Sequence, residues 1–240
     1  MDTPLPVMRG RYCRRHWALN LAMQAADTLL SVCRPLRARP AAIAPPRRLL
    51  ISNFAHLGDL VVATSLLPVL KSAFPECRIG FLIGSWSEPV LRGHPLVDDI
   101  HILDHWAASR TAAPRMEKLR RYRRTRRQAL GEVRAAGYDA ALDLCWTFPN
   151  TLPFLWQARI PTRIGYVSGA FGPLATRGLE FDARPLYVGA RHLALAQTLL
   201  SLIPTLAGEE AASLDQAAPI LPPVSRDDAA ALDRELQKAG

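Results

Sequence analysis

A glycine and a single aspartate, Gly58-Asp59, stand in the segment ISNFAHLGDLVVATSLLPVLKSAFP, where an apolar run gives way to a helical pattern. A carboxylate at such a turn can take a proton from a bound hydroxyl group and so act as a general base. An aspartate at a helix N-terminus is also a common cap, worth about 1 kcal/mol. The spacing alone favours the cap. Gly58 would let the backbone turn sharply and approach a ligand closely.

Other residues that could do chemistry are less well placed. His101 and His105 are four positions apart, but HILDHW crosses the end of an apolar run, so the two rings should not share a face, and we expect no metal site. No serine lies in a G-x-S-x-G context, and no G-x-G-x-x-G fingerprint is present. The four cysteines are scattered without a C-x-x-C pair, which indicates reduced thiols and a cytoplasmic protein.

The net charge of +9 is concentrated in two blocks, residues 1–50 and 110–134. The second block predicts a basic helix whose arginines could bind an anionic ligand, although a solvated helix face is an equally good interpretation. Tyr122 is the only aromatic residue in RMEKLRRYRRTRRQALGEVR, so we expect no nucleic-acid partner. The candidate anion-binding residues are Arg120, Arg123, Arg124 and Arg127.

The segment HWALNLAMQAADTLLSVC is interrupted by polar residues and is too short to span a bilayer. Arginines on both sides predict either an amphipathic helix lying on a membrane surface or a helix packed on the domain.

Buried-strand and helix patterns alternate along the chain, which predicts an α/β fold with a Rossmann-like parallel sheet and flanking helices. Pro68 should kink or end the first part of the helix expected at 60–73. The other expected helices cover 114–136, ended by Gly137, and 189–203, with shorter ones near 87–95 and 150–158. The expected strands cover 49–54, 75–84, 98–103, 138–146 and 162–167.

We divide the chain into three parts. Residues 1–46 contain the N-terminal helix and a Pro-rich linker, 47–222 form the Rossmann-like domain, and 223–240 form a polar helix. Because this helix follows a Pro-Pro hinge, we expect it to begin a second domain that is missing, and the chain to be truncated.

The segment LLISNFAHLGDLVVATSLLPVLKSAFPECRIGFLIG resembles the opening of glycosyltransferase family 9, the heptosyltransferases of lipopolysaccharide core assembly. GHPLVDDIHIL, GYDAALDL, TRIGY and RHLALAQTLL continue the likeness in order, so that it covers roughly residues 47–205. This resemblance implies the N-terminal half of a GT-B fold, in which an acceptor-binding domain faces a donor-binding domain. It also implies an inverting, metal-independent transferase without a cofactor.

The implied donor is a sugar nucleotide, expected to be ADP-heptose, and the acceptor is an anionic glycolipid of the lipopolysaccharide core. Asp59 maps onto the proposed general base, and Gly58, His56 and Thr64 lie near the acceptor. Asn53 stands where the family often has arginine, and His56 where it usually has Ser or Ala, so acceptor contacts differ. Peripheral contact with the cytoplasmic face of the inner membrane is a further expectation.

Trp146, Phe148 and Asn150 follow the fourth strand and should line the same mouth as Asp59 if the sheet is parallel. Trp146 and Asn150 could contact sugar, although core packing is the better interpretation of Trp146. A nucleotide-binding α/β protein of another class is a weaker hypothesis, because no glycine-rich phosphate loop is present. Two stronger hypotheses remain open. One is a glycosyltransferase. The alternative is a truncated, inactive glycolipid-binding module that lacks the donor domain.

Overall fold

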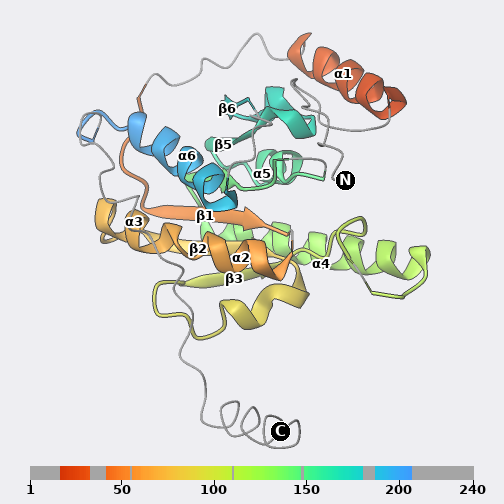
Figure 1. The fold of residues 1–240 in the computed structure, drawn as a ribbon, viewed down its shortest axis with the longest axis horizontal. Coiled ribbons are helices and arrows are strands. Elements are labelled where there is room, and N and C mark those ends of the chain that lie inside the picture. Colours follow the sequence, from red (N-terminus) through yellow and green to blue (C-terminus); the bar gives the residue numbers. More distant parts are fainter. Residues whose placement is uncertain are drawn as a thin grey trace, which may run out of the picture.

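The structure, a computed structural model, describes residues 17–32, 42–54, 56–109, 111–146, 149–180 and 187–206. Six parallel strands form one sheet in the order β3-β2-β1-β4-β5-β6 (Figure 1). The predicted α/β fold with a parallel sheet and flanking helices is therefore confirmed. The strands are β1 (Arg48–Asn53), β2 (Arg78–Ile83), β3 (Asp99–Ile102), β4 (Ala140–Asp143), β5 (Thr162–Tyr166) and β6 (Arg177–Leu179).

α-Helices or short 3₁₀ helices lie in the connections between the strands, because parallel neighbours cannot be joined by a tight hairpin. The sequence patterns predicted most of these elements, but not the short edge strand β6. The α-helices are α1 (Trp17–Val32), α2 (Leu57–Ala63), α3 (Leu66–Ala73), α4 (Arg115–Ala136), α5 (Leu152–Gln157) and α6 (Val188–Ser201). The 3₁₀ helices are η1 (Ser85–Val90), η2 (Val167–Gly169) and η3 (Gly172–Leu174).

Each face of the sheet has its own hydrophobic core. On one face, Leu49 and Ile51 of β1 pack among residues of α2, α3 and α6. On the other face, Leu50 of β1 packs with Val133 of α4 and Leu155 of α5. Successive side chains of β1 thus point to opposite cores, which is why this strand reads as an unbroken apolar run.

The strand order reverses between β1 and β4. β1 pairs with β2 on one side and with β4 on the other, and the connections run outward from both. Loops that leave the carboxyl ends of β1 and β4 therefore diverge, opening a crevice in which ligands of such sheets bind. Asp59 lies on the first of these connections.

The helix expected at 60–73 is two helices, as Pro68 predicted. α2 ends at Ala63, and the hydroxyl groups of Thr64 and Ser65 donate to the carbonyl groups of Val61 and Val62, both at 2.7 Å. Pro68 is the third residue of α3, where its missing N–H group costs no intrahelical bond.

α4 ends where the sequence predicted. Gly137 follows its last residue with φ of +67° and donates its N–H to the carbonyl of Val133. Only glycine adopts this left-handed conformation without steric cost, so it stops the helix cleanly.

α1 packs on the domain beside the β5–β6 side of the sheet (Figure 1). Met23 is buried, and the buried carboxylate of Asp27 accepts a 2.7 Å hydrogen bond from the N–H of Phe171. The expected helix in residues 1–46 is therefore present and docked through one face. In the described part of the chain, no helix is both long and apolar enough to cross a membrane. The helix expected in 223–240 lies outside the described residues.

Candidate functional site

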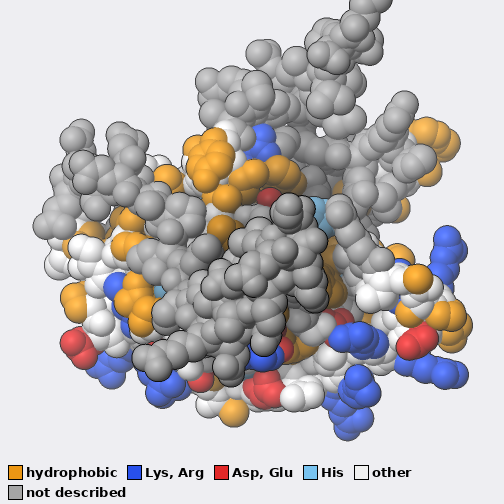
Figure 2. All heavy atoms as spheres, turned by 60° about the horizontal axis from the view of Figure 1, so that its bottom comes forward, with side chains coloured by type: hydrophobic (Ala, Val, Ile, Leu, Met, Phe, Trp, Pro, Cys, Tyr) orange, Lys and Arg blue, Asp and Glu red, His pale blue; other side chains and the backbone are white. Residues whose placement is uncertain are grey.

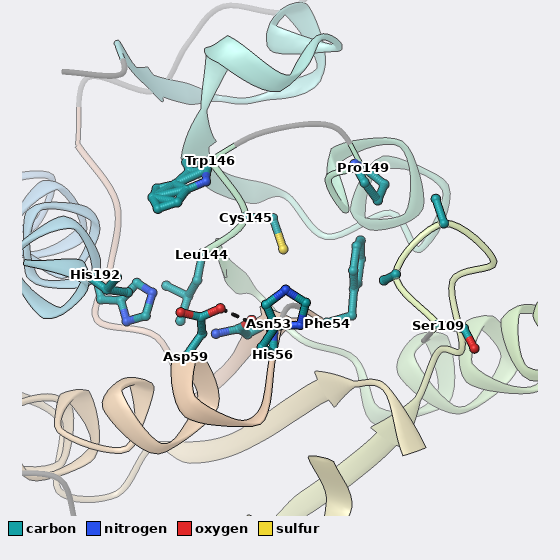
Figure 3. Close-up of a pocket in the computed structure, with 13 residues that line it drawn as sticks. Asn53, Phe54, His56, Asp59, Ser109, Leu144, Cys145, Trp146, Pro149 and His192 are labelled. Atoms are coloured by element: carbon teal, nitrogen blue, oxygen red, sulfur yellow. Dashed lines mark hydrogen bonds between the residues drawn. The ribbon is translucent and has the colours of Figure 1, made fainter. Parts of the chain in front are cut away.

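A cavity of about 390 Å³ opens at the reversal point of the strand order, between the carboxyl ends of β1 and β4 (Figure 3). Its size is within the range of small-molecule sites. Four segments contribute side chains to it: the β1–α2 connection, the loops that follow β3 and β4, and the start of α6. The lining residues are Asn53, Phe54, His56, Asp59, Ala107, Ala108, Ser109, Leu144, Cys145, Trp146, Pro149, Val188 and His192.

Asp59 lies in the first turn of α2, with its carboxylate in the cavity wall between His56 and His192 (Figure 3). The backbone N–H of His56, the residue before the helix, donates to its Oδ2 at 3.2 Å. Asp59 is thus a capping residue and a cavity residue at once. One carboxylate oxygen holds the helix start, and the group as a whole remains partly exposed to the cavity. The two interpretations of this residue are compatible.

A second aspartate, Asp143, binds the backbone of a loop that lines the cavity. It is fully buried at the end of β4, and its two oxygens accept bonds from the N–H groups of Thr151 (2.7 Å) and Cys145 (3.1 Å). Ser52 of β1 donates to it at 3.4 Å. Burial raises the pKa of the Asp143 carboxyl to about 6, although these hydrogen bonds oppose the shift. Asp143 therefore fixes the loop after β4, which carries Cys145 and Trp146.

Trp146 forms another part of the cavity wall. It is half-buried, and the guanidinium of Arg191 lies 4.1 Å from the centre of its ring. Trp146 also packs against the core on the α6 side of the sheet. Trp146 therefore packs against the core, as predicted, and also lines the cavity, as predicted.

His192 of α6 faces Asp59 in the cavity (Figure 3). Its side chain is only 3% exposed, and its Nδ1 has no hydrogen-bond partner among the described residues. Burial, together with the neighbouring charge of Arg191, lowers the pKa of His192 to about 4. At neutral pH the ring is therefore uncharged, with a nitrogen available to a ligand.

An aromatic cluster links the cavity to α4. Phe54 lines the cavity and stacks on His105 with ring centres 5.4 Å apart, and His105 meets Tyr122 of α4 at 4.9 Å. Burial lowers the pKa of His105 to about 4. His101 instead bonds Glu132 and Tyr138, at 3.1 and 2.9 Å, so the two histidines serve different contacts.

The structure brings together some of the residues predicted for the site, but not all. Asn53, His56, Asp59 and Trp146 line the cavity. Thr64 is buried at the α2–α3 junction, away from the lining. Phe148 lies outside the described residues.

Gly58 and Asn150 differ from their expected roles. Gly58 is the second residue of α2 with ordinary helical geometry, so no sharp turn requires it, and a methyl group there would meet no atom within 4 Å. Asn150 is buried, and its Nδ2 donates to the carbonyl of Ala170 at 2.7 Å, so it braces a loop and does not line the cavity.

The predicted arginines form a stripe on α4. They recur at three- and four-residue intervals, are exposed, and make no hydrogen bond or ion pair with the described part of the chain. Their face lies opposite buried Ala129 and Val133, and Figure 2 shows Lys and Arg side chains protruding on the side where α4 lies. Other basic residues of α4 are structural, as Arg121 pairs with Asp104 and Ser85. The α4 arginine stripe is Arg120, Arg123, Arg124 and Arg127.

The cavity combines a carboxylate, a neutral imidazole, an amide and aromatic rings. This set can take a proton from a hydroxyl group and hold a sugar ring by stacking and hydrogen bonding. Among the described residues, no three His, Cys, Asp or Glu side chains form a group that could hold a metal ion.

The sequence interpretation missed His192, Phe54 and Cys145 as cavity residues. For His192 a signal existed. It shares the buried face of α6 with Gly189, Leu195 and Leu199, and a lone polar residue on an apolar face needs a partner or a ligand. Phe54 and Cys145 carried no such signal, because apolar residues after buried strands are expected in any core.

Comparison with known proteins supports the resemblance seen in the sequence. No protein-family model matches the chain. The chain is 28% identical to lipopolysaccharide heptosyltransferase 2 of Salmonella typhimurium over 161 residues, which are 62% of this chain and 40% of that protein. The chain thus spans less than half of this curated relative.

Two solved structures share the fold. The E. coli ADP-heptose LPS heptosyltransferase II matches with a TM-score of 0.52 and 19% identity, over 79% of this chain and 50% of that protein. The glycosyl transferase family 9 protein from Veillonella parvula matches with a TM-score of 0.50 and 19% identity, over 66% of this chain and 43% of that protein. The predicted likeness to family 9 is confirmed, as is the predicted Rossmann-like fold.

Proposed function

We propose that this chain, which resembles the heptosyltransferases of glycosyltransferase family 9, is the acceptor-binding part of a glycosyltransferase. The donor is a sugar nucleotide, ADP-heptose, and the acceptor is an anionic glycolipid of the lipopolysaccharide core or a related glycan. The observation that carries the proposal is the place of Asp59, a carboxylate in the wall of a ligand-sized cavity at the reversal point of the sheet. The likeness to proteins named for this activity supports it.

In the proposed reaction, an acceptor hydroxyl lies within hydrogen-bond reach of Asp59. Its oxygen attacks the anomeric carbon of the donor sugar, and the bond from that carbon to the diphosphate breaks. The proton passes to the Asp59 carboxylate and the nucleoside diphosphate leaves from the opposite face, so that the configuration inverts. The mechanism requires no metal ion or cofactor.

The surroundings of Asp59 suit this role. Because the His56 N–H holds Oδ2 and α2 holds the backbone, the carboxylate is oriented before the acceptor arrives. His192 is uncharged at neutral pH, so it can form a hydrogen bond with a sugar hydroxyl and does not form an ion pair with Asp59. Trp146 offers a ring against which a sugar can stack.

The α4 arginine stripe provides a second contact for an anionic acceptor. Its four guanidinium groups are exposed on one helix face, a geometry that suits phosphate groups. A glycolipid acceptor also places the protein at a membrane, and we propose the cytoplasmic face of the inner membrane.

The test is a transfer assay with ADP-heptose and a truncated core acceptor, with the binding of each substrate followed by calorimetry. The wild type is compared with Asp59→Asn and with the control Glu76→Gln. The control removes an exposed carboxylate between α3 and β2, at the amino-terminal end of the strands and so at the opposite end of the sheet from the cavity. Loss of transfer in Asp59→Asn alone, with acceptor binding retained, supports the base.

Two other results lead elsewhere. Acceptor binding without donor binding or transfer in the wild type supports the alternative of an inactive glycolipid-binding module. Binding of neither substrate overturns the proposal and leaves only a shared fold.

A further inference from the structure

α1 exposes an apolar stripe along its whole length. Large apolar side chains recur at three- or four-residue intervals, with Ala25 in the remaining place of the series, so they share one side of the helix. Their exposed fractions are high for residues of this kind: 79% for Trp17, 58% for Leu21, 66% for Leu29 and 70% for Val32. An exposed apolar surface of this extent indicates an interaction site.

The opposite side of α1 is attached to the domain, which keeps the stripe pointing outward. Asp27 is 3% exposed and accepts the bond from the N–H of Phe171. Phe171 and Ala170 both have positive φ, a conformation that costs free energy unless it is held in place. Asp27 therefore braces this strained segment, and the helix cannot turn its stripe inward without losing that bond.

The charges around α1 indicate which kind of surface the stripe contacts. Asp27 is the only acidic residue between positions 3 and 58, and it is buried, so the exposed surface of the helix carries no charge. In the sequence, four arginines lie at 9–15, before the helix, and three at 34–39, after it. A bare apolar stripe between arginine clusters matches an anionic bilayer surface, where apolar side chains enter the lipid and arginines meet the headgroups.

We infer that α1 is an in-plane membrane anchor that docks its Trp17–Val32 stripe into an anionic lipid surface. With 16 residues it is ~24 Å long, enough to lie on a bilayer but short for spanning one. A second copy of the chain is a poorer occupant, because two chains of net charge +9 would bring their arginine clusters together. The inference concerns attachment and does not depend on which sugar is transferred.

Co-sedimentation of the full chain with vesicles tests this inference. The probe vesicles contain phosphatidylcholine with phosphatidylglycerol, and pure phosphatidylcholine vesicles serve for comparison. The test variant is Leu21→Glu/Leu29→Glu, on the stripe. The matched control is Gln24→Glu/Ser31→Glu, which adds the same charge at exposed positions outside the stripe.

We expect the stripe variant to bind anionic vesicles at least about tenfold more weakly than the control, since it removes two leucines from the lipid-facing side. Wild-type binding should weaken on neutral vesicles and at high salt. Circular dichroism and thermal melting show whether both variants remain folded. Equal binding by the two folded variants would overturn the inference. So would absent vesicle binding combined with a dimer, seen by light scattering, that only the stripe variant dissociates, because the occupant would then be a second copy.

Discussion

The guanidinium of Arg191 lies 4.1 Å from the ring centre of Trp146, and the next residue, His192, faces Asp59 across the same cavity. Two consecutive residues of α6 thus organise two parts of the wall. Arg191 holds the aromatic ring, and its charge lowers the pKa of the neighbouring imidazole. One turn of a helix far along the chain thus holds the proposed stacking ring and places an imidazole across the cavity from the proposed base.

The Arg191–Trp146 contact should contribute about 1 kcal/mol to stability, the usual value for a cation over an aromatic face. Arg191→Met keeps the aliphatic bulk and removes the charge, whereas Trp146→Leu removes the ring. A double-mutant cycle in urea should give a coupling free energy of this size. Additive effects of the two substitutions would show that the contact has no energetic role.

The two functions of Asp59 can be separated. Asp59→Asn keeps an oxygen that can accept from the His56 N–H, so the free energy of unfolding should fall by less than ~0.5 kcal/mol, and Asp59→Ala should lose about 1 kcal/mol. Transfer should fall by about 100-fold or more in both, because neither can take the proton. Urea unfolding and initial rates check this. Transfer that survives in Asp59→Asn but not in Asp59→Ala would make Asp59 a structural residue.

Gly58→Ala should separate stability from ligand approach. A methyl group at Gly58 meets no atom within 4 Å, and alanine is the better helix residue. The free energy of unfolding should therefore rise by ~0.5 kcal/mol, and the melting temperature should rise with it. If the acceptor contacts this backbone, its dissociation constant should rise as well. Calorimetry with the truncated acceptor checks the second point, and an unchanged constant would place the acceptor elsewhere in the cavity.

Acid should destabilise the fold between about pH 6 and pH 4. His192 and His105, with folded pKa values of about 4, each bind a proton on unfolding in this range, whereas Asp143, with a folded pKa of about 6, releases one. The net uptake of one proton makes the free energy of unfolding rise with pH by about 1.4 kcal/mol per unit.

Two variants test this balance with opposite signs. His192→Gln removes one of the two groups that bind a proton on unfolding, so the free energy of unfolding should become nearly independent of pH. Asp143→Asn removes the group that releases a proton on unfolding, so the dependence on pH should become steeper. Urea unfolding at several pH values from 4 to 6 measures both slopes. A flat wild-type profile, or the same slope in all three proteins, would contradict the assignment.

The α4 arginine stripe should contribute to the binding of anionic acceptor but not to stability. Arg120→Gln/Arg124→Gln should weaken acceptor binding and reduce its salt dependence, with little change in melting temperature. The control is Arg47→Gln/Arg159→Gln, which removes the same charge from exposed positions before β1 and β5, at the amino-terminal end of the strands. Equal loss in the two variants would indicate a general effect of net charge.

The sequence by itself determined the order of the strands and helices apart from β6, the end of α4 at Gly137, the helix break before Pro68 and the place of Asp59 after β1. These features are local. Periodicity shows which side of a segment is buried, and Gly and Pro act through their own backbone geometry. Family likeness added the proposed function and the proposed role of Asp59.

Only the tertiary structure decided which distant segments meet. His192 and Trp146 reach one cavity because the strand order places β1 beside β4 and α6 over that face, and no local pattern encodes such pairing. The same holds for Asn150, whose Nδ2 donates to the carbonyl of Ala170 twenty residues away, and for the place of α1. α1 docks through buried Met23 and through the long-range hydrogen bond from the N–H of Phe171 to Asp27, and its apolar side therefore faces the solvent.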